Sequence, residues 1–221
     1  MIEKVLLAWS GGKDSALALY EIRQRREYEI VGLLTTLSKD YDRVSMHGIR
    51  RSLLQRQADS LHLPLQQIFI SKKASNEEYE SKMQATLAKS RKAGVSSVVF
   101  GDIFLEDIRK YREDNLSKVG MKAILPLWQR DTAQLAQTFV DLGFKAIVTC
   151  VDSKVLNKRF AGRIIDEHFL AEIPPNVDPC GENGEFHSFV FDGPIFKSRI
   201  SYTIGQIVSR NSFYFCDLLP D

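Results

Sequence analysis

Cysteine is scarce in this sequence, and its spacing forms no recognisable pair. The 221 residues hold three cysteines, Cys150, Cys180 and Cys216, and no C-x-x-C pattern. This arrangement argues against a disulfide framework and against a zinc knuckle, and it suits a reducing compartment. Apolar runs of membrane-spanning length are also lacking. We therefore expect a cytoplasmic protein without a membrane partner.

An excess of charge of one sign is lacking as well. Lys and Arg number 30 against 28 for Asp and Glu, so the formal net charge is +2. This balance gives no general case for nucleic-acid affinity, and we expect no direct nucleic-acid partner. Two familiar glycine signatures are missing too, because neither G-x-x-x-x-G-K-S/T nor G-x-G-x-x-G occurs. Their absence argues against a Walker loop and against a dinucleotide-binding fingerprint.

One glycine-rich stretch stands out, Ser10-Gly11-Gly12-Lys13-Asp14-Ser15. It follows the apolar run 5–9 and precedes residues 16–20, which have helical character. A strand that turns on glycines into a helix N-terminus offers backbone N–H groups and the positive end of the helix dipole to an anion. The glycines let the backbone approach phosphate oxygens, the serines add hydroxyl donors and the lysine adds a cation. The alternative is a strand-to-helix turn without a ligand.

The rest of the chain alternates between predicted strands and helices. Strands are predicted at 5–9, 29–36, 65–70, 95–100, 122–128 and 145–151, and helices up to 26 and at 49–61, 75–93, 105–119, 131–142 and 157–172. This alternation predicts an α/β fold, a parallel sheet with helices on both faces. The tail changes to extended segments at 186–191, 195–207 and 213–218. We therefore predict a smaller C-terminal α+β lobe and divide the chain into 1–130 and 131–221.

Polar residues and glycines follow several of the predicted strands. Ser10, Thr35, Thr36, Gly101 and Asp102 all fall at strand carboxyl ends. Ligands of doubly wound sheets bind at that edge, near the point where the strand order reverses. We expect these residues to face one crevice.

Three residues have both a chemical and a plain structural interpretation. Asp14 and Asp102 are candidate magnesium ligands, but the first can equally cap a helix and the second can close a turn. His47 precedes a predicted helix, where it can stack near a nucleotide, hydrogen-bond a phosphate or be an ordinary surface histidine. The sequence leaves these alternatives open.

The other concentrated stretch is 179–188, which reads Pro-Cys-Gly-Glu-Asn-Gly-Glu-Phe-His-Ser and carries Glu182, Glu185 and His187. Two carboxylates beside a nucleotide site can bind a metal or accept protons from an incoming amine. The structural alternative is a turn that leads into the strand 186–191. Cys180 with His187 as a nucleophilic pair, or with the glutamates as a zinc site, lacks supporting ligands.

These stretches carry a resemblance to a known family. Residues Ser10–Ser15 resemble the pyrophosphate loop SGGxDS of the N-type ATP pyrophosphatases. Further motifs follow in the family's order: Met46-His47-Gly48, Gly101-Asp102-Ile103, Pro126-Leu127-Trp128, Gly181–Ser188 and Asp192-Gly193-Pro194. Over nearly the whole chain, the sequence looks like a member of the diphthine–ammonia ligase family, within the pyrophosphate-loop ATP-binding proteins.

The resemblance implies a fold and a reaction. The fold would be a HUP-type, Rossmann-like ATP-binding domain at 1–130 followed by an acceptor-side lobe at 131–221. The reaction would use ATP and Mg²⁺ to adenylate a carboxylate with release of pyrophosphate, after which ammonia displaces AMP and leaves an amide. In the family the carboxylate belongs to diphthine, a modified histidine of translation elongation factor 2.

The resemblance also implies roles for single residues. The phosphates would be held by Ser10, Gly11, Gly12, Lys13, Asp14 and Ser15. The nucleoside would lie among Thr35, His47, Gly101 and Asp102. The catalytic residues would be Lys13, Asp14, Glu182, Glu185 and His187, of which the last three would serve the acceptor side.

The chain departs from the family pattern at three places. Asn183 stands where the family commonly has glycine, and Ser188 where it has threonine. The segment 106–113 looks like the branch that is also found in bacteria, which lack diphthamide. The carboxylate acceptor is therefore left open by the sequence.

Two other functions compete with the ligase. One is a nucleotide-binding regulatory protein that senses ATP or AMP without turnover, although two carboxylates near the site would then have no evident use. The other is a pyrophosphate-loop tRNA-modifying enzyme, which usually has an RNA-binding extension or catalytic cysteines. The sequence does not determine the oligomeric state, and a homodimer is one option.

Overall fold

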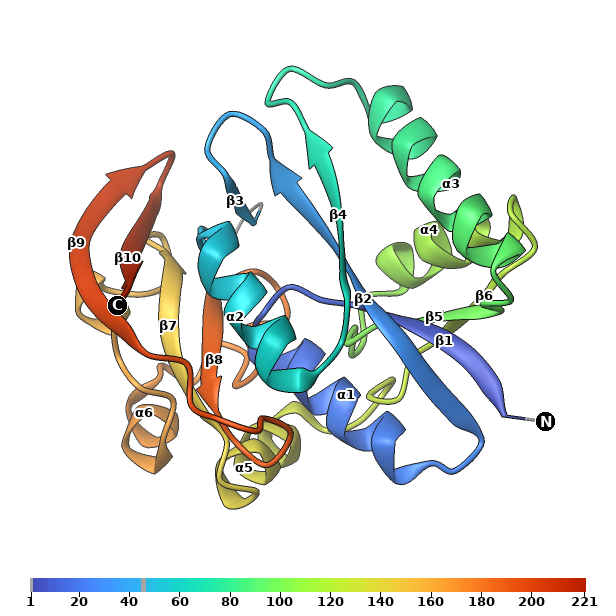
Figure 1. The fold of residues 1–221 in the computed structure, drawn as a ribbon. Helices are drawn as coiled ribbons and strands as arrows, with labels where there is room; N and C mark the ends of the chain where they lie inside the picture. The colour runs from blue at the N-terminus through green and yellow to red at the C-terminus, as the bar shows by residue number, and fades with distance from the viewer. Residues whose placement is uncertain (1, 45–46) are drawn as a thin grey trace.

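The computed structural model describes residues 2–44 and 47–221. Met46, part of the Met46-His47-Gly48 motif, lies outside the described residues. Figure 1 shows the elements, which in chain order are β1 (Glu3–Ala8), α1 (Lys13–Gln24), β2 (Tyr28–Ser38), β3 (Arg43–Val44), α2 (Arg51–Leu61), β4 (Leu65–Ile70), α3 (Asn76–Lys92), β5 (Ser97–Val99), α4 (Glu106–Ser117), β6 (Lys122–Ile124), α5 (Thr132–Asp141), β7 (Lys145–Asp152), the 3₁₀-helix η1 (Lys158–Phe160), α6 (Glu167–Glu172), β8 (Phe186–Asp192), β9 (Tyr202–Arg210) and β10 (Phe213–Pro220).

The first lobe is built on a sheet of order β3-β2-β1-β5-β6, in which β4 also pairs with β2. β1 pairs in parallel with β2 and β5, while β4 and β6 extend the parallel part on either side. The chain therefore runs outward from β1 through β2 to β4, and then returns to β5 on the other side of β1. The strand order reverses between β1 and β5, which is where such sheets bind ligands.

Helices cover both faces of this sheet because apolar residues on its strands point to both sides. Leu7 of β1 packs in a cluster with residues of α1 and α2. Its neighbour Leu6 packs in a second cluster with Leu87 of α3 and Leu116 of α4. Successive side chains on a strand face opposite ways, so one strand can contribute to both layers. The predicted α/β fold with helices on both faces is confirmed.

The C-terminal lobe is a four-stranded sheet of order β8-β7-β10-β9, and all of its strand pairs are antiparallel. α1 and α2 lie between this sheet and the first one (Figure 1). A single apolar cluster contains Leu17 of α1, Leu54 of α2 and Phe189 of β8. The two lobes therefore share one continuous hydrophobic core.

The prediction of one helix at 157–172 is wrong. The structure has only η1 and α6 there, and the residues between them run along β7. Gly162 N donates to Val148 O at 2.8 Å, and Ile165 N donates to Ala146 O at 2.9 Å. Gly162 has a φ of +82°, outside the range of a right-handed helix. Pairing with β7 thus replaces the helical hydrogen bonds.

Smaller differences occur at the strand ends. The strand predicted at 122–128 stops at Ile124, shortly before Pro126, which has no N–H group for a ladder. The extended segment predicted from residue 195 becomes a strand only at Tyr202. Ser75 caps the start of α3, where its Oγ accepts from Glu78 N at 3.2 Å, while the Glu78 side chain pairs with Lys82 at 2.7 Å. Within 2–44 and 47–221, no helix has the length and apolar character that a membrane crossing requires.

Candidate active site

A cavity of about 550 Å³ opens where the carboxyl ends of β1, β2 and β5 meet. Most of the residues predicted for the site line it: Ser10, Lys13, Asp14, Ser15, Thr35, Thr36, His47, Gly101, Asp102, Glu182 and His187. The expected crevice therefore exists, and residues from both lobes form it. Among the described residues, Gly11, Gly12 and Glu185 are the predicted ones that stay outside its lining.

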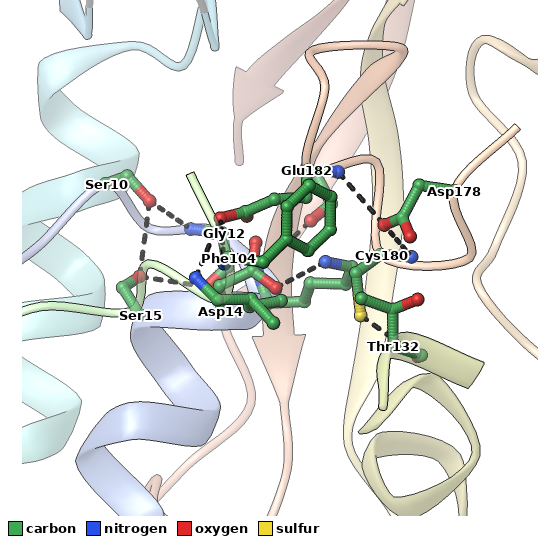
Figure 2. A network of polar contacts seen from close by, with 12 residues as sticks. Ser10, Gly12, Asp14, Ser15, Phe104, Thr132, Asp178, Cys180 and Glu182 are labelled. Carbon is green, nitrogen blue, oxygen red and sulfur yellow. Dashed lines mark hydrogen bonds and ion pairs between the residues drawn. The ribbon is translucent and has the colours of Figure 1, made fainter. Parts of the chain in front are cut away.

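The loop between β1 and α1 has the geometry of an anion site. α1 begins at Lys13, and its N-cap residue, Gly12, has no side chain that could accept from the first turn. Ser10 Oγ accepts from Gly12 N at 3.2 Å and lies 3.3 Å from Ser15 Oγ. Figure 2 shows the two hydroxyls side by side next to Gly12. The helix N-terminus and the paired hydroxyls can together bind phosphate oxygens.

Lys13 supplies a buried positive charge beside this loop. Its side chain is 3% exposed and forms an ion pair with Asp14, which is 35% exposed. Burial opposes the ammonium charge, but the nearby acidic groups, Asp14 first and then Cys180 and Glu182, together outweigh burial and raise the pKa of Lys13. Lys13 is therefore a permanent cation at neutral pH. Burial also raises the pKa of Asp14, against the effect of the Lys13 charge.

The C-terminal lobe holds the loop in place through β8. Ser188 Oγ accepts from Lys13 N at 3.1 Å, and Val190 N donates to Gly11 O at 2.9 Å. A Cβ on Gly12 would approach Ser188 O to 3.1 Å and the His47 ring to 3.2 Å. The sequence predicted that the missing side chain of Gly12 lets a phosphate approach the backbone. In the structure, Ser188 and His47 already lie close to Gly12, so a side chain there would also crowd the protein itself.

Gly101 lets the loop after β5 pack against the first turn of α1. A Cβ at this position would lie 2.7 Å from Asp14 C and 2.8 Å from Asp14 O, and side chains do not occur that close to backbone atoms. Gly101 also lines the cavity. Its lack of a side chain brings the ends of β1 and β5 together at the switch point.

Asp102 does not offer free oxygens to a metal ion. Both of its carboxylate oxygens accept from Arg112 of α4, one of them from Nη2 at 3.0 Å and the other from Nε. The guanidinium lies 4.3 Å from the Phe100 ring centroid. The expectation that Asp102 binds magnesium therefore conflicts with its bidentate pair, because Arg112 already neutralises the charge.

Arg112 is a cavity residue that the sequence did not identify. Part of α4 is a solvated helix face, where Arg109 pairs with Glu113 at 2.8 Å. Arg112, however, lines the cavity together with Ile108 and Leu116. Ile108, Arg112 and Leu116 are spaced by four residues, so Arg112 lies on the same helix face as the two apolar residues. This spacing is the feature of the sequence that could have identified Arg112 as a cavity residue.

Glu182 connects the acidic loop to the loop after β5. Its Oε1 accepts from Ile103 N at 2.7 Å and from Phe104 N at 3.4 Å, and Figure 2 shows the side chain reaching toward Phe104. Burial raises the pKa of Glu182 to about 7, although the two N–H groups act in the opposite direction. A carboxyl with this pKa exchanges protons near neutral pH, which suits a general acid or base.

Glu185 is turned into its own loop. Its Oε1 accepts from Asp178 N and from Asn183 Nδ2, both at 3.0 Å. Its side chain is 6% exposed, and Oε2 has no partner in the part of the chain that the structure describes. This position holds the loop in shape and does not bring Glu185 to the cavity, in contrast to the direct catalytic role expected for it.

Cys180 has the environment of a structural thiol. Its Sγ donates to Thr132 O at 3.3 Å, and burial raises the pKa of the thiol to about 12. Within the described residues, no group of three or more His, Cys, Asp or Glu side chains could hold a metal ion. These observations disfavour both the nucleophilic pair with His187 and the zinc site.

His47 and His187 lie next to each other in the cavity wall, with their rings tilted. Their ring centroids are 4.4 Å apart, with an angle of 37° between the planes. Burial lowers the pKa of His187 to about 4 and holds that of His47 well below its usual value, and the charge of Lys13 acts in the same direction. Both rings are therefore neutral at pH 7. In the described chain, His47 Nδ1 and His187 Nε2 are buried without a hydrogen-bond partner.

The neutral histidine pair predicts a loss of stability in acid. A histidine whose folded pKa is lowered stabilises the fold above its unfolded pKa, near 6.5, and this contribution is lost as the pH falls toward the folded pKa of about 4. For His187 the loss would be on the order of 2–3 kcal/mol. We expect the free energy of unfolding, measured with urea between pH 7.5 and 4.5, to fall more steeply in the wild type than in His187→Gln.

The control for this experiment is His168→Gln, because His168 is exposed on α6. This variant should follow the wild-type curve at every pH. Equal slopes for the wild type and His187→Gln would contradict the neutral pair.

Several apolar residues of the cavity lining come from positions that no motif marked. α3 contributes Tyr79, Met83 and Leu87, and α4 contributes Ile108 and Tyr111. These positions follow helical spacing, which the sequence shows only as an ordinary core stripe. The cavity lining thus combines the polar loop 10–15 with apolar side chains of α3 and α4, among which the polar Glu80, Gln84 and Asn115 also lie.

A parallel sheet whose first strand ends in an anion-binding loop, with a cavity at its switch point, defines a nucleotide-binding α/β protein. The family model described as "Diphthamide synthase N-terminal domain" matches residues 3–123, and "Diphthamide synthase C-terminal domain" matches residues 131–217. The chain belongs to the diphthamide synthase family. The predicted family resemblance is confirmed.

Three curated proteins that are similar to this chain share one name. A "Diphthine--ammonia ligase" of Schizosaccharomyces pombe is 28% identical over 97% of this chain, and those of Bos taurus and Homo sapiens are 26% and 25% identical over 92%. The match spans 38% of the length of the S. pombe protein and 84% of the bovine and human proteins.

Proposed function

We propose that this protein is an ATP-dependent amide ligase that forms AMP and pyrophosphate. One observation carries the proposal: the loop 10–15 and the carboxyl of Glu182, which come from different lobes, line the same cavity. The names of the relatives support ammonia as the nitrogen donor and diphthine as the acceptor. We propose that the acceptor carboxylate is presented by elongation factor 2 or by a smaller molecule that carries a similar group.

The first step joins the acceptor to AMP. An acceptor carboxylate oxygen attacks the α-phosphorus, the bond to the bridging oxygen breaks, and pyrophosphate leaves. Lys13 neutralises the charge that develops on the pyrophosphate, while the N-terminus of α1 and the hydroxyls of Ser10 and Ser15 hold its oxygens. The nucleoside lies toward Thr35, His47 and Gly101, at the ends of the neighbouring strands.

Mg²⁺ fits this site through the substrate. Asp14 is partly exposed and pairs only one oxygen with Lys13, so its other oxygen can face a metal ion. The protein alone offers too few ligands, but Mg²⁺ commonly binds through one or two carboxylates together with substrate phosphates. Bound there, Mg²⁺ would neutralise phosphate charge during cleavage. We propose Asp14, and not Asp102, as the protein ligand.

The second step forms the amide. Ammonia attacks the carbonyl carbon of the acyl adenylate, a C–N bond forms, the C–O bond to AMP breaks, and one proton leaves the nitrogen. We assign that proton to Glu182, whose pKa of about 7 suits a general base. Neutral His187 orients the acceptor, and Glu185 keeps the acidic loop in shape. We propose residues 1–130 as the ATP-binding part and 131–221 as the acceptor-side part of a cytoplasmic enzyme, in keeping with three buried free cysteines.

Nucleotide analysis tests this function directly. The protein is incubated with ATP, Mg²⁺, ammonium and either diphthine-bearing elongation factor 2 or a panel of free carboxylic acids. We expect one AMP and one pyrophosphate for each amide formed. ADP and phosphate as products would contradict the ligase, and tight ATP binding without turnover on every acceptor would favour an ATP sensor.

A further inference from the structure

A buried glutamine behind the phosphate loop has no role in the reaction described above. Gln57 lies on α2 and is 0% exposed. Its amide nitrogen donates to Gly11 O at 3.0 Å and to Val190 O at 2.6 Å. Its amide oxygen accepts from the indole N–H of Trp9 at 2.9 Å. One side chain thus connects the residue before the loop, the loop itself and β8.

The bond to Gly11 fixes the orientation of a peptide group in the loop. In a trans peptide, the carbonyl and the next N–H point in opposite directions. Gly11 O accepts from Gln57 and also from Val190 N at 2.9 Å, and holding this oxygen toward both donors sets the direction of the Gly12 N–H, which donates to Ser10 Oγ. Gly11 has a φ of +80°, and a glycine pair lets a peptide turn over easily. A turned peptide would place a carbonyl oxygen where the loop needs a donor.

The surroundings of Gln57 leave it one orientation. A Cβ on Gly11 would meet Gln57 Oε1 at 2.7 Å and Leu54 Cδ1 at 2.8 Å, so the missing side chain makes room for α2. The indole N–H of Trp9 can only donate, and it therefore selects the oxygen end of the amide. The nitrogen end is left to face the two carbonyls, both of which can only accept. All three bonds agree on the same orientation.

We propose that Gln57, oriented by Trp9, is a positioning residue that keeps the Gly11–Gly12 peptide in the form that binds the pyrophosphate part of ATP. Gln57 lies behind the loop and acts through Gly11. The inference rests on the proposed function for the identity of the anion. It predicts a selective loss: binding of the phosphates should suffer, while binding of the nucleoside should not.

The test compares three variants by calorimetric titration with pyrophosphate, ATP and adenosine, each in the presence of Mg²⁺. Gln57→Leu keeps the approximate size and removes all three bonds. Trp9→Phe keeps an aromatic ring and removes the donor that orients the amide, together with part of a buried side chain that lines the cavity. Ser60→Ala is the matched control, because Ser60 is also buried on α2 and donates to Ser198 O in the C-terminal lobe at 2.7 Å.

For Gln57→Leu we expect the Kd of pyrophosphate and of ATP to rise at least about tenfold, and the Kd of adenosine to change less than about twofold. Trp9→Phe should weaken pyrophosphate binding about threefold. If Gln57→Leu does not fold, the result for Trp9→Phe tests the inference instead. Ser60→Ala should bind all three ligands like the wild type. Unchanged pyrophosphate binding in the Gln57 and Trp9 variants, or an equal loss for adenosine, would overturn the inference. A wild-type protein that binds neither pyrophosphate nor ATP would instead contradict the proposed function.

Discussion

Replacing Lys13 with methionine is expected to lower kcat/KM for AMP formation at least about a thousandfold, which corresponds to about 4 kcal/mol. Methionine preserves the length of the side chain and removes the charge. Lys13 is the cation that the structure places at the start of α1, buried and paired with Asp14. Without it, the charge that develops on pyrophosphate would lie beside an uncompensated carboxylate. AMP release, followed by chromatography at saturating acceptor, measures the effect.

Two further variants show whether the loss of activity in Lys13→Met is specific to the charge at this position. Lys4→Met removes a lysine from the exposed start of β1, at the opposite end of that strand, and should leave the rate unchanged. Lys13→Arg keeps the charge but requires more space at a side chain that is only 3% exposed, so it should restore little activity. AMP formation by Lys13→Met within tenfold of the wild type would show that another group neutralises the pyrophosphate.

Replacing Glu182 with glutamine is expected to lower the rate of amide formation about a hundred- to a thousandfold, with the Kd of ATP changed less than about threefold. Glutamine can still accept from Ile103 N, so the contact to the loop after β5 remains while the basic oxygen is lost. At a constant concentration of free ammonia, the wild-type rate should rise with pH around 7, where Glu182 loses its proton. This rise should be missing in Glu182→Gln.

Glu182→Ala separates the two roles of the side chain. If Glu182 only anchors the loop, glutamine should restore full activity and alanine should not. If it acts as the base, both variants should be slow, with alanine the slower because it also loses the backbone contacts. Glu167→Gln, at an exposed position of α6 in the same lobe, should behave like the wild type.

The parts of the site that local pattern determines were predictable. The loop 10–15 and the glycine and aspartate after β5 lie at strand ends, and the strand order of an α/β sheet brings those ends together. The family motifs added the acidic loop at 181–188. In each case the information lies within a few neighbouring residues, which is the range that a single sequence reveals.

The contacts between the lobes could not be predicted in this way. Gln57 is an ordinary helical residue in the sequence, and its partners Gly11 and Val190 are 46 and 133 positions away. The orientation of Glu185 depends on a turn of its own loop, which composition does not determine. The false helix at 157–172 has the same cause, because pairing with β7 outweighs the helical preference of the intervening residues.

β8 gives the two halves of the reaction a common support. Along this strand His187 lines the cavity, Ser188 accepts from Lys13 N and Val190 donates to Gly11 O. Residues so close along one strand do not shift independently. An acceptor that displaces His187 would therefore alter the affinity of the loop for ATP, and bound ATP would alter the affinity for the acceptor by the same factor. We therefore expect the affinity for ATP, measured with and without the acceptor, to differ, and the affinity for the acceptor to differ by the same factor with and without ATP.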